Sequence, residues 1–225
     1  MNAVLRARST LLAGSMILGG ICIFLGHLLN VNSAEAPAKY VADISAHHAA
    51  FIAGSVIVSA GSFLVIAAMV GAMRLAPGRG GTLVTIGAVL ACISAASLGA
   101  GTLMLGIVMG MLTPAHAALA VQVAQIGQSG LGSLPFTLAP GLVIGPVLVA
   151  IGLYRARLAH RWLAILLGVA VVPVFVAPSG GLLGAVLHLP LCVALAGLGI
   201  EVWRSSRRDS QVLPVPQREV YPAQA

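Results

Sequence analysis

Long uninterrupted apolar runs dominate the chain, and polar or charged residues fall in short groups between them. A helix that crosses the hydrocarbon core of a bilayer needs about 20 mainly apolar residues. The runs and their breaks predict six spans, at Thr10–Asn30, His48–Met73, Thr82–Met111, Pro135–Tyr154, Arg161–Ala177 and Gly181–Trp203. Strand periodicity is absent, and only helices and closed barrels satisfy their backbone groups in lipid. The predicted fold class is therefore all-α, a bundle of six transmembrane helices.

Two of the breaks depend on polar and turn residues, because no charged residue marks them. Gly80 to Tyr154 contains no Asp, Glu, Lys or Arg, so we place a break in the glutamine- and serine-rich stretch that ends at Pro135. The uncharged run from Trp162 to Ile200 would form a single helix of roughly 58 Å, nearly twice the hydrocarbon thickness. The turn sequence Pro178-Ser179-Gly180-Gly181 divides that run.

The segment after the third span has an amphipathic pattern of its own. Leu119, Val123 and Ile126 recur at helical spacing, with glutamines on another face. Thr113-Pro114 is typical of an N-cap followed by proline at the first helical position. We predict a short amphipathic helix at the outer surface, with an irregular loop as the alternative.

Composition excludes a soluble domain. The chain is 59% hydrophobic and 8% charged, with a mean hydropathy of +1.05, whereas a soluble domain is about 25% charged. The net charge is +7, and the six-span topology puts every basic residue except Lys39 on one side of the membrane. The positive-inside rule then places both termini in the cytoplasm, with residues 206–225 as a disordered cytoplasmic tail. Aromatic residues are only 4%, and this charge pattern does not favour nucleic-acid binding.

The first apolar run has two interpretations. Arg6 and Arg8 precede it and Ala34-Glu35-Ala36 resembles a cleavage site, which is the pattern of a secretory signal peptide. The uncharged run is longer than the roughly 7–15 residues of a signal core, so we favour an uncleaved first span.

Five of the six histidines lie on the outer side in this topology, and they are the candidate metal ligands: His27, His47, His48, His116 and His188. Imidazole binds zinc, copper or haem iron, so the candidate cofactors are haem, copper or zinc. For haem, His27, His48 and His188 are the candidate cofactor-binding residues, and the function would be electron transfer. Met104, Met109 and Met111 near the same end favour copper. The alternative is that these histidines are structural or interfacial, since no metal-binding spacing such as HExxH or CxxC is present.

Prolines interrupt the fourth span and suggest a second function. Pro140 and Pro146 each remove a helix hydrogen bond, and discontinuous helices line the substrate sites of transporters. The alternative is a packing kink. The second hypothesis is therefore a non-catalytic bundle that carries a small hydrophobic molecule or supports a membrane protein partner or a homo-oligomer. The sequence holds no catalytic motif and leaves enzyme activity undecided.

Small residues predict where helices pack closely. The pairs Gly106/Gly110, Gly141/Gly145 and Gly180/Gly184 have the small-xxx-small spacing that lets membrane helices approach one another.

Three parts of the chain resemble an uncharacterised family of small actinobacterial multi-span integral membrane proteins. They are His27-Leu28-Leu29-Asn30, the run from Tyr40 to His47, and the turn from Arg74 to Arg79. The resemblance covers most of residues 1–205. It implies a bacterial plasma membrane protein and no particular activity.

Overall fold

The computed structural model describes residues 3–31, 36–75, 78, 80–128, 140–156, 160–176 and 180–211, and over these residues the chain is helical without strands. The helices are α1 (Ala3–Leu29), α2 (Pro37–Ala46), α3 (His48–Leu75), α4 (Gly81–Ala115), α5 (Ala117–Gln128), α6 (Pro140–Ala156), α7 (Arg161–Val176) and α8 (Gly181–Gln211). The all-helical fold class is confirmed.

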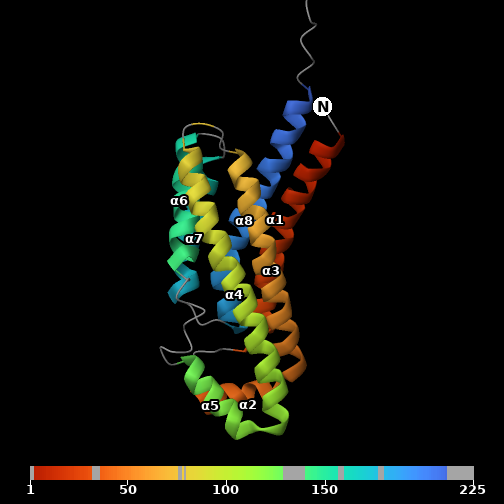
Figure 1. Cartoon of the computed structure of the whole chain (residues 1–225), viewed down its shortest axis with the longest axis vertical. Coiled ribbons are helices and arrows are strands. Elements are labelled where there is room, and N and C mark those ends of the chain that lie inside the picture. Colours follow the sequence, from red (N-terminus) through yellow and green to blue (C-terminus); the bar gives the residue numbers. More distant parts are fainter. Residues whose placement is uncertain are drawn as a thin grey trace, which may run out of the picture.

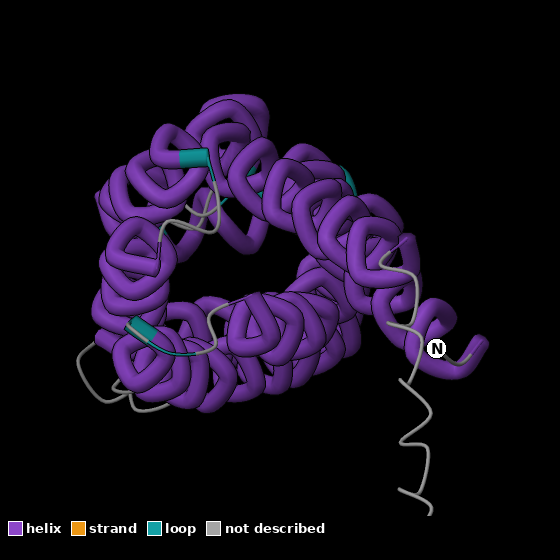
Figure 2. Tube along the Cα trace, turned by 90° about the horizontal axis from the view of Figure 1, so that it is seen from above, coloured by secondary structure: helices purple, strands orange, loops and turns teal. Residues whose placement is uncertain are grey.

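The six longer helices form a closed ring. Each packs against the next in the order α1, α3, α4, α6, α7, α8, and α8 packs against α1 again. Figure 2 shows the ring from above, and Figure 1 shows the helices standing side by side. Met16, Met69, Val84, Leu153 and Leu195 are among the buried side chains that form the core inside this ring.

Large apolar side chains also cover the outside of the bundle. Leu11, Ile93, Ile165 and Leu182 are exposed examples from four different helices. Four helices are long and apolar enough to cross a membrane, over Ala7–Leu29, His48–Met73, Gly81–Ala115 and Gly181–Arg207. These helices indicate a membrane protein. Helices α6 and α7 are apolar but have 17 and 16 residues, about 25 Å against a hydrocarbon core of about 30 Å. Six spans therefore stay a prediction.

Basic side chains gather at one end of the bundle, which we call the arginine end. Arg161 lies over the Tyr154 ring at 6.0 Å, and Arg207 lies over the Trp203 ring at 3.8 Å. Glu201 on α8 is 3.0 Å from Nδ1 of His160, which precedes α7. These contacts keep the cationic groups beside the ends of apolar helices, as expected where a bundle leaves the membrane.

The opposite end carries α2 and α5, which lie across the far ends of α3 and α4 and which we call the cap (Figure 1). Its apolar core consists of Tyr40, Val41, Ile44, Phe51, Met109, Ala120 and Ala124. Burial raises the pKa of the Tyr40 phenol to about 12. Helix α5 confirms the predicted amphipathic helix, whereas α2 lies between the first and second predicted spans, where no helix was predicted.

The predicted N-cap at Thr113 is wrong, because α4 continues through Thr113 and Pro114 to Ala115. A proline inside a helix has no N–H for the carbonyl four residues earlier. Here that carbonyl belongs to Gly110, and the Nε2 atom of His48 lies 2.6 Å from it. The imidazole N–H thus replaces the donor that Pro114 lacks, and α4 continues to Ala115.

Two other boundaries also differ from expectation. Helix α8 continues to Gln211, so residues 206–211 are helical and do not belong to a disordered tail. Residues 212–225 lie outside the described residues, as do Pro135 and the rest of the predicted start of the fourth span.

Gly145 and Gly110, each from one of the predicted small-residue pairs, lie at close helix contacts. A Cβ atom on Gly145 of α6 would lie 2.7 Å from the Ala91 nitrogen and 2.7 Å from the Gly87 oxygen of α4. At the other side of α4, a Cβ atom on Gly110 would lie 2.9 Å from the Ile52 side chain of α3. Glycine lets the backbones of α4 and α6 touch at Gly145 and lets the Ile52 side chain reach the backbone of α4 at Gly110, as small residues do in membrane helix pairs.

Candidate functional site

A cavity of about 70 Å³ lies inside the ring. All six ring helices contribute to its wall, with Ile23 and His27 from α1, Ser62 from α3, Ala95 from α4, Pro146 from α6, Val171 from α7, and His188 from α8. The rest of the described wall is aliphatic or methionine. The cavity is therefore an apolar space in the centre of the bundle with a few polar groups on its wall.

Two of the predicted histidines meet at this wall. The rings of His27 and His188 are stacked, with centroids 3.9 Å apart and planes inclined by 19°. The His188 residue is buried at 4% exposure, and its Nδ1 atom is 2.7 Å from the Gly184 carbonyl oxygen. A carbonyl only accepts, so Nδ1 carries the hydrogen. In the neutral ring, Nε2 is then the acceptor.

Close packing of α1 against α8 brings these rings together. A Cβ atom on Gly20 would lie 3.1 Å from the Cys192 Cα atom, and the Cys192 thiol donates to the Gly20 carbonyl at 3.0 Å. The Gly181 N–H donates to the Asn30 carbonyl at 2.8 Å, which ties the end of α1 to the start of α8. These contacts align α1 with α8, so that His27 and His188 lie at the same height along the bundle and their rings meet.

Two further polar groups belong to the cavity wall. The Ser62 hydroxyl donates to the Val58 carbonyl at 3.0 Å, four residues earlier. Pro146 lies inside α6 and has no N–H for the carbonyl of Leu142, and both residues line the cavity. Sequence reasoning missed Ser62, since a serine in an apolar helix gives no signal of which way it faces.

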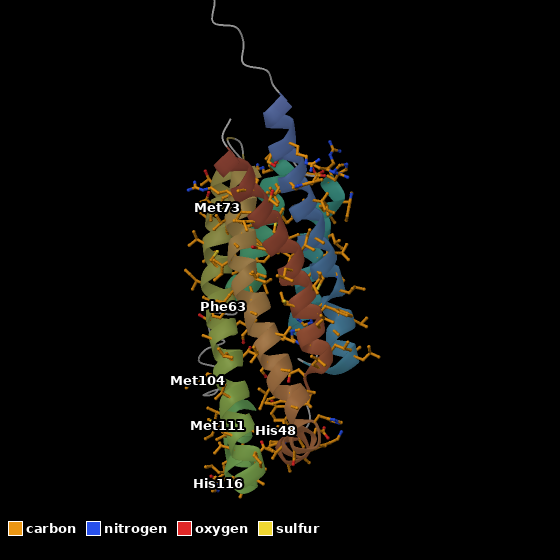
Figure 3. All side chains as sticks on the ribbon, turned by 90° about the vertical axis from the view of Figure 1, so that its right-hand side faces the viewer. His48, Phe63, Met73, Met104, Met111 and His116 are labelled. Carbon is orange, nitrogen blue, oxygen red and sulfur yellow. The ribbon has the colours of Figure 1, made fainter. Side chains whose placement is uncertain are left out.

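The other three predicted ligands lie elsewhere. His48 bonds to Gly110 and joins α3 to α4, while His47 and His116 are exposed at helix ends near the cap. Figure 3 shows His48 and His116 toward that end. The structure therefore pairs His27 with His188 and separates both from the remaining three.

A metal or haem site does not follow from this arrangement. Among the described residues, no three His, Cys, Asp or Glu side chains gather where they could hold a metal ion. A haem held by two histidines has one imidazole on each face of the porphyrin. Rings stacked at 3.9 Å leave no room for a porphyrin between them.

The methionines do not form a copper site either. Met104 and Met111 are 70% and 73% exposed on α4, while Met109 is buried in the cap core. The first two are seven residues apart, about 10 Å along the helix, which is too far to share one ion. Figure 3 shows them well separated along α4.

No protein family, no curated protein and no solved structure matches this chain.

Proposed function

We propose that this protein is a six-span bundle that holds a small, mainly apolar molecule in its central cavity. The observation that carries the proposal is the shared wall: all six ring helices line one cavity, and the stacked His27 and His188 form part of it. This is the second of the two functions that the sequence suggested. The wall favours an uncharged occupant, because burying an unpaired ion among aliphatic side chains costs several kcal/mol or more.

Xenon is expected to bind in this cavity, because dry apolar cavities bind xenon and benzene. The full chain in lipid nanodiscs, with labelled methyl groups, is titrated with xenon. Methyl signals of Val58 and Leu167, which line the cavity, should shift and saturate. Val172, which is 57% exposed on α7, should respond only in proportion to the xenon dissolved in lipid.

Variants of Ala95 test whether the cavity is the binding place. Ala95 is fully buried in the wall, so Ala95→Val should weaken the saturable shift and Ala95→Leu should remove it. Ala100→Leu adds the same atoms to an exposed position of the same helix and should leave the shift unchanged. Two outcomes contradict the proposal. One is saturable xenon binding that persists in a folded Ala95→Leu variant, and the other is a lack of saturable xenon binding in the original chain.

We also propose that the arginine end faces the cytoplasm of a bacterium and the cap faces outward. The support is the charge distribution, with Lys39 on the cap and the arginines of α7 and α8 at the opposite end. In a chain without its three native cysteines, Lys39→Cys should react with an impermeant maleimide in intact cells. Arg207→Cys should react only after permeabilisation, and reaction of both from the same side would overturn the six-span topology.

A further inference from the structure

We infer that the occupant of the cavity is a small neutral molecule with one hydroxyl group, which donates a hydrogen bond to Nε2 of His188. The inference rests on the proposed function and adds the chemical class of the ligand.

A hydrogen bond to the backbone fixes the orientation of the His188 ring. Gly184 lies one turn earlier on α8, and its carbonyl oxygen is 2.7 Å from Nδ1. This bond holds the hydrogen on Nδ1, so the lone pair of the neutral ring is on Nε2. The His27 ring covers one face of His188 at a centroid distance of 3.9 Å. The Nε2 lone pair lies in the plane of the His188 ring, so a ligand that bonds to it approaches the edge of the ring and not the face that His27 covers.

Ser62 and the Leu142 carbonyl add two further polar groups to the wall. The Ser62 hydroxyl uses its hydrogen on the Val58 carbonyl and keeps its lone pairs. The Leu142 carbonyl has no N–H from Pro146. The Gly110 carbonyl in α4 likewise receives no N–H from Pro114, and there the His48 side chain supplies the hydrogen-bond donor. The Ser62 oxygen, the Leu142 carbonyl and Nε2 of His188 can each accept a hydrogen bond, so these three groups suit a ligand that donates one.

The cavity wall disfavours charged ligands. The described wall holds no Asp, Glu, Lys or Arg. A cation would lose its hydration without meeting a carboxylate, and an anion would face acceptors. An amine basic enough to be protonated is excluded for the same reason. A neutral hydroxyl donates one hydrogen and leaves the remainder of the molecule to the aliphatic wall.

The volume of the cavity limits the size of the ligand. An engineered apolar cavity of about 150 Å³ holds benzene, which has six heavy atoms. A cavity of about 70 Å³ is roughly half as large, so it suits a molecule of about three heavy atoms. The ligand class is therefore a short-chain alcohol.

Ethanol and dimethyl ether provide a matched test, because they are isomers with the same atoms and only ethanol donates a hydrogen bond. The full chain in nanodiscs, with ¹⁵N-labelled histidine, is titrated with each isomer while the His188 Nε2 signal is followed. One neutral hydrogen bond corresponds to roughly a fivefold difference in affinity, so ethanol should bind about fivefold more tightly than dimethyl ether. Only ethanol should move the Nε2 signal in the direction of a hydrogen-bonded acceptor.

A variant of His188 shows whether this ring is the acceptor. His188→Phe keeps an aromatic ring beside His27 and removes Nε2. Ethanol and dimethyl ether should then bind to this variant with about equal affinity, measured from the methyl signals of Val58. His160→Phe removes the exposed histidine beside Glu201 at the arginine end and should keep the fivefold preference.

The outcomes separate this inference from the proposed function. Saturable xenon binding with equal affinity for the two isomers overturns the hydroxyl assignment and leaves the cavity as a binding site. Xenon binding with no response to either isomer also overturns it. If xenon, ethanol and dimethyl ether all fail to bind in the cavity, the proposed function itself is contradicted. The comparison of isomers on the original chain decides the inference even where His188→Phe does not fold.

Discussion

Gly145→Val is expected to force α4 and α6 apart and to leave the bundle strongly destabilised. A Cβ atom at this position would lie 2.7 Å from two backbone atoms of α4, in Ala91 and Gly87, and a backbone cannot turn aside as a flexible side chain can. Overpacking costs about 1–3 kcal/mol in ordinary cores, and we expect at least the upper end here, about 3 kcal/mol. Thermal unfolding in detergent, followed by circular dichroism, measures the loss.

Gly14→Val is the matched control for this substitution. A Cβ atom on Gly14 of α1 would meet nothing within 4 Å, so the same added side chain should change stability little. Equal melting temperatures for Gly145→Val and Gly14→Val would show that α4 and α6 do not pack as described, and the wall that α6 gives to the cavity would then lose its support.

Phe51→Ala is expected to open the cap while the ring of helices stays folded. Phe51 is 2% exposed and lies at the start of α3, with its ring edge-on to Tyr40 at a centroid distance of 6.3 Å. Truncating a buried phenylalanine costs about 3–5 kcal/mol through lost burial and the cavity left behind. The amides of α2 and α5 should therefore exchange with deuterium much faster, because these helices share the apolar core of the cap.

Phe63→Ala controls for the loss of an aromatic ring from the same helix. Phe63 is 46% exposed on the outer surface of α3, so its truncation removes contact mainly with lipid. Exchange in α2 and α5 should stay at the level of the original chain. If Phe51→Ala left this exchange unchanged as well, the cap would not depend on the buried contacts that the structure shows.

The correction at Thr113-Pro114 shows how a local pattern can mislead. Threonine followed by proline is a good helix start in isolation, because proline lacks an N–H that the first turn does not need. Inside α4 the same lack leaves the Gly110 carbonyl without its helix donor, and His48 from α3 supplies one. The partner is 62 residues away in sequence. Neighbouring residues therefore gave no sign that the helix continues.

Helix α2 was missed although its pattern was visible. Tyr40 and Val41 come four and three residues before Ile44, which is helical spacing, with Lys39 just before them and Asp43 between Val41 and Ile44. Its polar residues and Pro37 favoured a connection between spans, and the helix is only 10 residues long. Isolated helices of this length are marginal in water, so α2 depends on its packing against α5, α4 and α3.

The approximate positions of the apolar helices, and the placement of arginines at one end, follow from the sequence alone. Both depend on runs of neighbouring residues, since a spanning helix needs a long apolar run and each charge must stay near water. The pairing of His27 with His188, the separation of His48 from them, and the cavity itself were decided by the tertiary structure. They depend on the order of helices around the ring and on the rotation of each helix about its axis, which side-chain contacts between distant segments determine.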